Sequence, residues 1–466
     1  MLRLLKQYYP IRNAIFVIGE GMVIYLSVLM ACGILLSTEL LHPSYQLTLK
    51  ILLITITCQV CLYYNDLYNL SVVDSYSELG IRLLQSLGVA AIVLAGVYTV
   101  FPDAIIGRGI FIVSIAIVIL LIVSWRFCYN IVINKGLFNQ KIILLGSGDF
   151  ADLIAEKIES KKDCGYSIQL RLYEYPSRRA DEVAGSSNGQ LSTSSYSGLY
   201  EQAVELNTDK IVVALKERRG GVYVRELLRS RVSGVDVIEG TSFFEMLTGR
   251  LYVELTNPGW FIFSEGFKKS PLKVVAKRMF DILVSTTMLL MLTPVIVIVA
   301  LLIKIDSKGP IFFSQERVGH NRNPYRVHKF RSMVTDAEVK SGPVWAQDED
   351  PRVTKIGKLI RKWRIDEIPQ LWNVLKGEMS FVGPRPEREH FVKQLEEQIP
   401  YYGVRFSVKP GLTGWAQVSY GYGASVQDAI EKLNYDLFYI KNMSLLLDIV
   451  IFIRTVKTVI FGIGAR

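Results

Sequence analysis

The sequence predicts a multidomain membrane protein: a four-helix transmembrane bundle, a Rossmann-like α/β domain, and a mainly helical C-terminal domain with a re-entrant membrane hairpin. Three observations predict this fold class. Long apolar runs fill residues 1–137, and a strand, a glycine-rich turn and a helical pattern follow near residue 140. A proline-interrupted apolar stretch near residue 290 lies between two basic flanks.

The composition of the chain limits the kinds of molecule to which it could bind. Half of the 466 residues are hydrophobic, and the mean hydropathy is positive, which is unusual for a purely soluble protein. The formal net charge is +10, and basic chains tend to bind nucleic acid, anionic lipid or phosphorylated substrates. Because the apolar content favours the lipid bilayer, we expect no nucleic-acid partner.

Four apolar runs each approach the roughly 20 residues that a helix needs to cross a bilayer. They are Ala14–Leu36, Leu47–Tyr64, Leu83–Phe101 and Ile110–Ile133. Glu20 within the first run is tolerable if it faces neighbouring helices. A signal peptide is the alternative for this run, but the apolar pattern continues beyond the cleavage-like Leu29–Cys32. Basic residues before the first run and after the fourth favour an even number of crossings with both ends cytoplasmic.

Residues 138–265 indicate a Rossmann-like accessory domain. The strand Lys141–Leu145 enters a turn in which Gly146 and Gly148 could approach a nucleotide, and a helical pattern follows. The next suitable acid, Glu174, lies 28 positions after Gly146 rather than about 20, which weakens the dinucleotide-binding signal. The remaining strand-like runs are Ser167–Tyr173, Lys210–Leu215 and Val235–Ile238, and the Ser/Gly-rich Ser186–Ser197 predicts an exposed loop.

Residues 266–305 carry the fifth apolar stretch, Met279–Ile303, which Pro294 interrupts. Arms of about 15 and 9 residues reach roughly 22 and 14 Å, and neither crosses a hydrocarbon core of about 30 Å. Basic residues flank the stretch on both sides, and both flanks prefer the cytoplasmic face. The pattern predicts a re-entrant hairpin that breaks at Pro294; the alternative is a fifth spanning helix bent at this proline.

The rest of the chain, 306–466, is polar and rich in arginine, and its end, Met443–Arg466, predicts an interfacial amphipathic helix. Asp366 and Glu367 stand shortly before Pro369, a residue type favoured at the start of a helix. Such a position suits phosphate and anionic groups. One carboxylate could attack phosphorus and the other could hold Mg²⁺, although an isolated pair of this kind is usually only charge complementation of a helix end.

Cations near this pair support the phosphate interpretation. Lys329 and Arg331 alternate, so they share a face if their segment is a strand. Arg385 lies between two prolines, and arginine suits bidentate phosphate contacts. Arg364 and Lys409 complete the predicted substrate-binding residues.

These motifs resemble the bacterial sugar transferase family, the monotopic phosphoglycosyl transferases, from about residue 273 onward. The matching segments are Lys277–Asp281, Lys329–Met333, Asp366–Gly377, Ser380–Glu387 and Lys409–Gln417. The helices and the nucleotide-fold domain upstream resemble the long members used in exopolysaccharide and O-antigen assembly. Because similar domains in those members are accessory, the resemblance implies a structural or regulatory domain without tightly bound NAD.

The resemblance implies that residues 306–466 form a catalytic domain on the cytoplasmic face of the bacterial inner membrane. It would transfer hexose-1-phosphate from a UDP-hexose to polyprenyl (undecaprenyl) phosphate and release UMP. Asp366 would carry the phosphosugar, Glu367 alongside Asp366 would bind Mg²⁺, and Lys329, Arg331 and Arg385 would neutralise phosphate charge. The sugar stays open, with glucose, galactose and N-acetylated hexoses as candidates, and the first half of the chain could supply a homodimer contact.

Two other functions remain as alternatives. A membrane-anchored NAD-dependent nucleotide-sugar dehydratase or epimerase would need a Tyr-x-x-x-Lys pair, and Tyr325 with Lys329 is the one match, inside a transferase motif. A non-enzymatic scaffold of a polysaccharide assembly complex would leave the phosphate-binding residues without a role.

Overall fold

The computed structural model describes residues 11–36, 44–68, 76–107, 109–134, 139–160, 164–172, 190–192, 198–215, 221–256, 258–335, 350–421, 423 and 425–462. The chain forms two compact units that divide in sequence between Phe243 and Phe244. Residues 244–265, expected to close the α/β domain, therefore belong to the second unit. Leu251 and Val253 lie in that unit's core, and the Leu251 amide donates to the carbonyl of Asn434.

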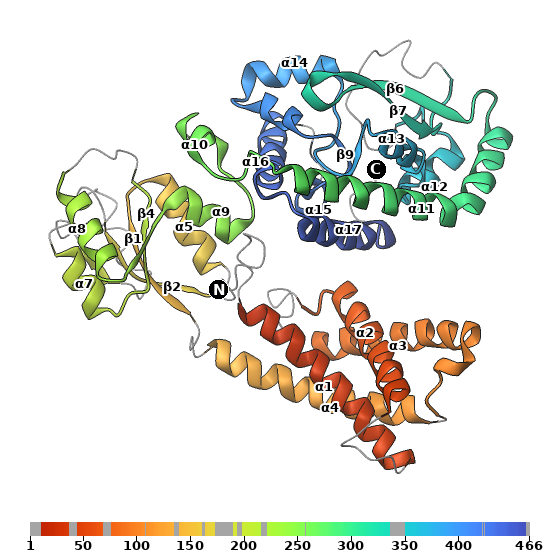
Figure 1. Ribbon diagram of the computed structural model, residues 1–466, viewed down its shortest axis with the longest axis horizontal. Helices are drawn as coiled ribbons and strands as arrows, with labels where there is room; N and C mark the ends of the chain where they lie inside the picture. The colour runs from red at the N-terminus through yellow and green to blue at the C-terminus, as the bar shows by residue number, and fades with distance from the viewer. Residues whose placement is uncertain are drawn as a thin grey trace. The chain divides into compact units, whose positions relative to one another are not determined.

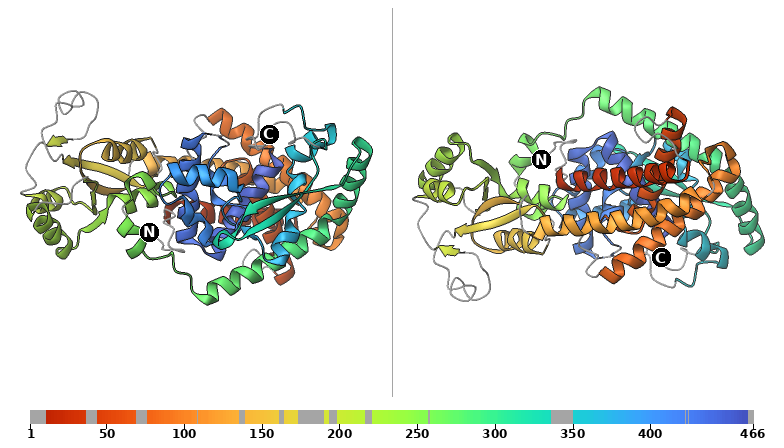
Figure 2. Two further views of the ribbon diagram at one scale, coloured as in Figure 1. Left: turned by 90° about the horizontal axis from the view of Figure 1, so that it is seen from above. Right: turned by 90° about the horizontal axis from the view of Figure 1, so that it is seen from below.

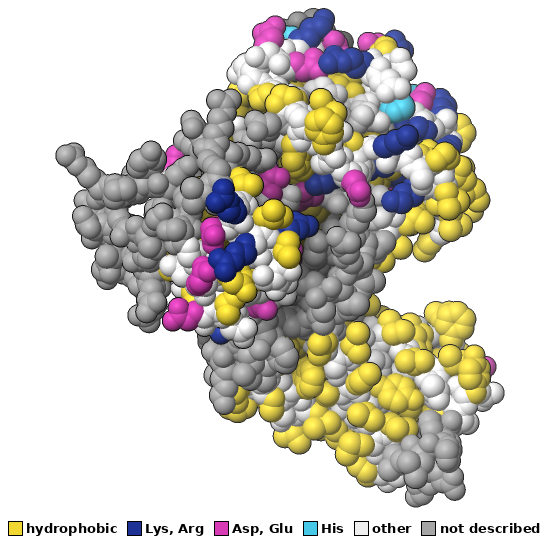
Figure 3. Space-filling view, turned by 60° about the vertical axis from the view of Figure 1, so that its left-hand side comes forward, with side chains coloured by type: hydrophobic (Ala, Val, Ile, Leu, Met, Phe, Trp, Pro, Cys, Tyr) yellow, Lys and Arg dark blue, Asp and Glu magenta, His cyan; other side chains and the backbone are white. Residues whose placement is uncertain are grey.

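Four long apolar helices open the first unit (Figure 1), and a short 3-10 helix, η1 (Pro102–Ala104), follows the third. The helices are α1 (Ile11–Leu36), α2 (Tyr45–Tyr64), α3 (Tyr76–Val100) and α4 (Ile110–Asn134). α1 packs against α4 and α2, and α2 packs against α3. Each is long and apolar enough to cross a membrane, and Figure 3 shows hydrophobic side chains over their outer surface. This region is therefore helical and membrane-protein-like, as its apolar runs predict.

Glu20 faces neighbouring helices, as expected. Its side chain is fully buried and pairs with Arg126 of α4, whose Nε and Nη2 lie 2.9 and 2.7 Å from Glu20 Oε1. Arg126 also donates to the carbonyl of Leu67. Two charges that would be costly alone in an apolar bundle thus neutralise each other.

A five-stranded parallel sheet follows, in the order β3-β2-β1-β4-β5. The strands are β1 (Gln140–Leu145), β2 (Tyr166–Leu172), β3 (Gln190–Ser192), β4 (Lys210–Val213) and β5 (Asp236–Glu239). Helices α5 (Asp149–Glu159), α7 (Leu199–Glu205) and α8 (Gly221–Val232) separate strands along the chain, and α9 (Gly240–Thr248) follows β5. The four predicted strands agree with β1, β2, β4 and β5 to within two residues.

The predicted loop Ser186–Ser197 is wrong at its centre. Gln190–Ser192 forms β3, which pairs in parallel with Leu170–Leu172 at the edge of the sheet. Sequence patterns detect a strand by its apolar residues. This edge strand is formed by backbone hydrogen bonds to β2 and does not need an apolar run, so the pattern does not reveal it. The residues on either side of β3, and Glu174, lie outside the described ranges.

The second unit is mainly helical, as predicted, with two small sheets. β6 (Phe312–Val318) pairs antiparallel with β7 (Pro324–Phe330), and β8 (Ser380–Val382) pairs in parallel with β9 (Gly411–Thr413). Its α-helices after α9 are α10 (Pro258–Phe263), α11 (Pro271–Asp306), α12 (Lys355–Lys362), α13 (Gln370–Lys376), α14 (Glu389–Gln398), α15 (Trp415–Ser419), α16 (Val426–Asn442) and α17 (Leu445–Ile460). Short 3-10 helices are η2 (Val253–Leu255), η3 (His320–Arg322), η4 (Ile365–Glu367) and η5 (Tyr402–Ser407).

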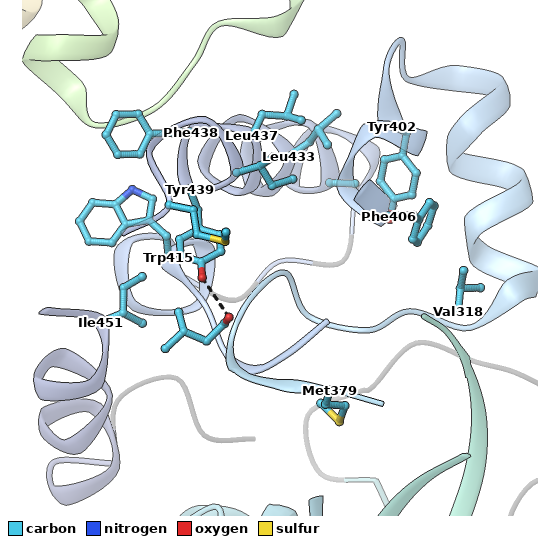
Figure 4. Packing of buried hydrophobic residues seen from close by; sticks show 14 of the residues in the cluster. Val318, Met379, Tyr402, Phe406, Trp415, Leu433, Leu437, Phe438, Tyr439 and Ile451 are labelled. Carbon is cyan, nitrogen blue, oxygen red and sulfur yellow. Dashed lines mark hydrogen bonds between the residues drawn. The ribbon is translucent and has the colours of Figure 1, made fainter. Parts of the chain in front are cut away.

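The core of this unit gathers around α16 (Figure 4). Leu433, Leu437 and Phe438 of α16 are buried together with Trp415 and Tyr402 from the flanking elements. This core includes Phe381 and Val382 of β8, the strand that leads into the Arg385 turn.

The predicted break at Pro294 does not interrupt the helix: α11 is a single 36-residue helix that continues through this proline. Its ribbon changes direction before it reaches β6 (Figure 1, Figure 2). Both of its ends are anchored to the second unit. Near the start, Asp281 and Ser285 are buried, and near the end Val299 and Ile303 pack against Phe330 and Ile360. Between these anchors, Leu290 and Met291 are more than 70% exposed. α11 therefore presents an apolar middle between two protein-bound ends.

α17 packs into the second unit along one face. Leu447, Asp448 and Ile451 are buried, whereas Leu446, Ile449 and Ile453 are exposed. Asp448, a charged residue within the predicted interfacial helix, faces the protein interior and pairs with Lys277 of α11 at 2.8 Å. Its position is explained by this distant lysine rather than by the water-exposed face of the helix.

Candidate active site

Asp366 and Glu367 lie in η4, immediately before α13. Arg364 adopts a left-handed backbone conformation with φ of 52°, which turns the chain from α12 into η4. α13 begins directly after Pro369, within a residue of the predicted start. Ile365 and Ile368 pack against the cluster that contains Val299 and Ile303 of α11. The apolar neighbours of the two acids thus fix them beside the membrane-type helix.

Glu367 is held by cations from three separate segments. Lys329 Nζ and Arg385 Nη2 lie 2.9 and 2.8 Å from Glu367 Oε1, and Arg364 Nη1 lies 4.0 Å from Oε2. Burial alone would raise the pKa of Glu367, but Arg385, Lys329 and Arg364 outweigh it and hold that pKa well below the ordinary value. Glu367 is therefore ionised across the physiological pH range.

Asp366 differs from its neighbour in its partners. It is 8% exposed, and no side chain or amide among the described residues donates a hydrogen bond to its carboxylate. Burial raises the pKa of Asp366; the charge of Lys329 lowers it and that of Glu367 raises it. The site therefore combines the carboxylate of Glu367, which is paired with cations, with the buried carboxylate of Asp366, whose negative charge the nearby cations only partly offset.

Two rigid segments bring the main cations to Glu367. Lys329 lies on β7, in register with Phe313 of β6. Arg385 follows β8 in the turn Gly383–Pro386, and its side chain stays about 40% exposed beside Glu367. A Cβ on Gly383 would lie 2.5 Å from the carbonyl oxygen of Lys409, so this close approach of the β8 and β9 segments requires glycine.

Arg405 holds the Arg385 turn from behind. Its Nη2 donates to the Arg385 carbonyl at 2.8 Å and to Asp436 Oδ2 at 3.0 Å, and its Nη1 donates to the Tyr402 hydroxyl. Burial raises the pKa of Asp436 to about 6 although Arg405 opposes this shift. No sequence motif singled out Arg405 or Asp436, because Arg405 lies 20 residues from Arg385 and 31 residues from Asp436.

α11 anchors β8, the strand that leads to Arg385. Asp281 Oδ1 accepts hydrogen bonds from Ser380 Oγ and the Phe381 amide, both at 3.0 Å. The Tyr439 hydroxyl donates to the Val382 carbonyl at 3.0 Å and lies 2.8 Å from Asp448 Oδ1. The motif at the start of α11 and the motif before Arg385 are thus direct structural partners.

Arg331 and Lys409, two predicted substrate-binding residues, are not among the cations that contact Glu367. Arg331 is buried and donates to the carbonyls of Ser307 and Lys308, just after α11. It lies one residue beyond the end of β7, so the alternation that would place it beside Lys329 does not continue. Lys409 lies near Arg278; burial, followed by the charge of that arginine, lowers its pKa. Phosphate contacts of Arg331 and Lys409 remain predictions.

Both glycines of the predicted nucleotide turn have a positive φ. Gly146 and Gly148 have φ values of 143° and 96°, and a Cβ on Gly146 would lie 2.4 Å from the carbonyl oxygen of Ala214. The turn connects β1 to α5, while nucleotide binding stays a prediction. Across the described part of the chain, no group of three or more His, Cys, Asp and Glu could hold a metal ion. Asp366 and Glu367 supply two adjacent carboxylates.

Fold and site together define a membrane-associated protein with a cation-lined pair of buried acids. The model of the family described as bacterial sugar transferase matches residues 272–462. An Aeromonas hydrophila UDP-N-acetylgalactosamine-undecaprenyl-phosphate N-acetylgalactosaminephosphotransferase is 41% identical over 259 residues, covering 55% of this chain and 60% of the relative. A Komagataeibacter xylinus undecaprenyl-phosphate glucose phosphotransferase is 35% identical over 333 residues, covering 70% and 60%.

A shorter relative is covered almost completely. The exopolysaccharide production protein PSS of Rhizobium leguminosarum bv. phaseoli is 42% identical over 191 residues, which cover 39% of this chain and 94% of the relative. This chain belongs to the bacterial sugar transferase family. It aligns with about 60% of the length of the Aeromonas and Komagataeibacter relatives.

Proposed function

We propose that the protein transfers a hexose-1-phosphate from a UDP-sugar to undecaprenyl phosphate, with release of UMP, as the first step of exopolysaccharide or O-antigen repeat-unit synthesis. The observation that carries this proposal is the unequal pair of buried carboxylates. Asp366 has no hydrogen-bond donor among the described residues, while Glu367 is held by Lys329 and Arg385. The names of the relatives support undecaprenyl phosphate as the acceptor.

The reaction takes place in two displacements at one phosphorus atom. An Asp366 carboxylate oxygen attacks the sugar-bearing β-phosphorus, an oxygen–phosphorus bond forms, and the bridging oxygen leaves with UMP. A phosphate oxygen of the polyprenyl acceptor then attacks the same phosphorus, forms the lipid diphosphate sugar and returns Asp366 to its carboxylate form. Lys329 and the exposed part of Arg385 stabilise the phosphate charge, because guanidinium and ammonium groups bind phosphate oxygens strongly.

Mg²⁺ fits the two acids. This hard cation is usually bound by one or two carboxylates together with substrate phosphates. The raised pKa of Asp366 indicates that the nearby side-chain cations do not fully offset its burial. Glu367 and Asp366 would hold the ion, and the bound ion would neutralise phosphate charge.

We also propose that α11 is a re-entrant helix at the cytoplasmic face of the inner membrane. A spanning helix would leave its two ends on opposite faces of the bilayer. Here Asp281 near one end binds Ser380, and Arg331 binds Ser307 just after the other end, within one compact unit. The exposed apolar middle of α11 and the basic residues on both flanks support shallow insertion from one side.

Cysteine labelling tests this topology. In a variant without the five native cysteines, Lys268→Cys and Lys308→Cys should both react with a membrane-impermeant maleimide in inverted vesicles and stay unlabelled in right-side-out vesicles. Labelling of the two positions from opposite sides would mean that α11 spans the bilayer. The residues after α11 would then lie on the face of the membrane that the cytoplasmic sugar donor does not reach, which would contradict the catalytic proposal.

The first unit completes the proposal as a four-helix transmembrane bundle followed by a Rossmann-like accessory domain. The strand order 3-2-1-4-5 is the order of the first five strands of doubly wound dinucleotide folds and supports this assignment. The dehydratase alternative is disfavoured because its candidate Lys329 is paired with Glu367, in a different unit from the Gly146 turn.

Transfer of label into lipid separates the three functions. Membranes that contain the protein are incubated with UDP-hexoses labelled in the sugar, with undecaprenyl phosphate and with or without Mg²⁺. The proposal predicts Mg²⁺-dependent label in the lipid fraction and UMP as the released nucleotide. Release of UDP would indicate ordinary glycosyl transfer, a changed UDP-sugar with NAD and no lipid product would indicate the dehydratase, and no turnover would leave the scaffold function.

A further inference from the structure

A basic cavity lies at the start of α11, away from the acidic pair. It has a volume of about 640 Å³, and its walls come from the segment before α11, the first turn of α11 and the junction of α16 with α17. Four lysines, Lys268, Lys269, Lys273 and Lys441, line it, against one carboxylate, Glu265. The cavity is thus large enough for a small organic ligand and strongly positive.

The four lysines divide into two kinds. Lys269 Nζ donates to the carbonyls of Gly266, Ile440 and Lys441. Lys441 Nζ pairs with Glu245 at 2.6 Å and lies 4.3 Å from the Trp260 ring centre. These two lysines hold the walls together.

Lys268 and Lys273 are exposed. Within the described residues, the structure gives neither of them an acidic partner. Their charges are therefore available to a ligand with a negative group.

The surroundings of the cavity indicate a lipid rather than a dissolved anion. Ile262 and Phe263 of α10 are 74% and 85% exposed, and Leu272 and Val275 at the start of α11 are 79% and 59% exposed. Large apolar side chains next to free amines match the boundary between headgroups and acyl chains of a bilayer.

The cavity is also distinct from the proposed catalytic site. The residues next to Asp366 pack with the part of α11 that begins at Val295. The residues that line the cavity include neither acid of that site and none of the cations that contact Glu367, which are Lys329, Arg364 and Arg385. The cavity is therefore formed by a different set of residues from the proposed catalytic site.

We propose that this cavity binds the phosphate headgroup of an anionic phospholipid of the surrounding bilayer, and that the amines of Lys268 and Lys273 contact the phosphate. The assignment rests on the proposed insertion of α11 from one face. Binding there orients the start of α11 at headgroup depth and makes the seating of the second unit depend on the anionic lipid content of the membrane.

Lipid retention in native mass spectrometry tests the proposal. The full chain is reconstituted in phosphatidylcholine nanodiscs with or without phosphatidylglycerol, no sugar donor is added, and the lipids kept by the released protein are counted. Wild type should keep phosphatidylglycerol in preference to phosphatidylcholine. The double variant Lys268→Ala with Lys273→Ala should weaken retention of phosphatidylglycerol about 30-fold. Each basic residue near a membrane surface strengthens binding of anionic lipid by a factor of roughly 5 to 6, and the two factors multiply.

Two control variants separate the charge of the site from general effects. Lys268→Arg with Lys273→Arg keeps both charges and should keep the lipid. Lys157→Ala with Lys393→Ala removes the same charge elsewhere and should also keep it. Equal retention by the wild type and the Lys268/Lys273 alanine variant would overturn the proposal. So would competition by inorganic phosphate, which would indicate a free-anion site, or preferred retention of undecaprenyl phosphate over phosphatidylglycerol. Because no donor is present, failure of the transferase proposal would not alter this readout.

Discussion

Replacing Arg405 by lysine should separate the positioning of Arg385 from folding. Arg405 bridges the Arg385 carbonyl and Asp436 through Nη2 and contacts Tyr402 through Nη1. Lysine keeps a positive charge opposite Asp436, but its single nitrogen cannot reproduce the planar fork of arginine. A hydrogen bond from a charged donor contributes about 1.5–3 kcal/mol. If the Arg385 carbonyl loses this bond and the turn shifts, turnover should fall about 10- to 150-fold.

The assay is the initial rate of UMP release at saturating UDP-sugar, with the melting temperature measured on the same preparation. Arg405→Ala is not suitable, because an unpaired buried Asp436 would cost about 3–5 kcal/mol and could unfold the domain. Arg229→Lys changes an exposed arginine of the first unit and should leave the rate unchanged. Wild-type turnover in folded Arg405→Lys would refute the positioning role. A lower melting temperature without a change in turnover per folded molecule would make Arg405 purely structural.

Three further predictions concern carboxylates of the second unit. The pKa of Asp366 is raised in the folded protein, so ionising this carboxyl lowers the stability of the fold above the unfolded pKa of about 3.9. Asp366→Asn should therefore melt at a higher temperature than the wild type at pH 7 and at the same temperature at pH 3. A lower melting temperature of the variant at pH 7 would contradict this. The pKa of Asp436 is raised to about 6, so the stability of the protein should fall as pH rises from about 4 to 6. In thermal scans across this pH range, Asp436→Asn should lose less melting temperature than the wild type. An equal loss in both proteins would exclude Asp436 as the cause of the pH dependence. Asp281→Ala leaves Ser380 Oγ and the Phe381 amide without their acceptor and should destabilise by about 2–4 kcal/mol in denaturant unfolding, whereas Asp281→Asn, which keeps one oxygen, should lose less.

Local patterns predict the elements of this chain well because their signals are local. The apolar runs agree with α1 to α4, and Pro369 marks the start of α13. The pairing of Lys329 and Arg385 with Glu367 agrees with the predicted grouping of cations around the acids. In each case a residue type has a preferred place in a helix, a bilayer or a phosphate site.

Long-range partners are not visible in such patterns. Asp448 interrupts an apolar run in the sequence, yet it is buried because Lys277, 171 residues earlier, pairs with it. Lys329 and Arg331 share a face only if the strand continues past both residues. β7 ends at Phe330, however, and Arg331 donates to the carbonyl of Ser307, just after α11. Arg405 belongs to no motif recognised in the sequence, and only the fold brings it to the Arg385 carbonyl.

The central claim is that Asp366 carries the phosphosugar between donor and acceptor. The most direct measurement incubates the purified full chain with a UDP-hexose labelled in its β-phosphate, without lipid acceptor, and follows label on the protein. The account predicts that label appears on the peptide containing Asp366 with an equal amount of UMP, leaves when undecaprenyl phosphate is added, and is absent from Asp366→Asn. Label of equal extent on Asp366→Asn, or turnover in which no protein-bound label forms, would contradict it.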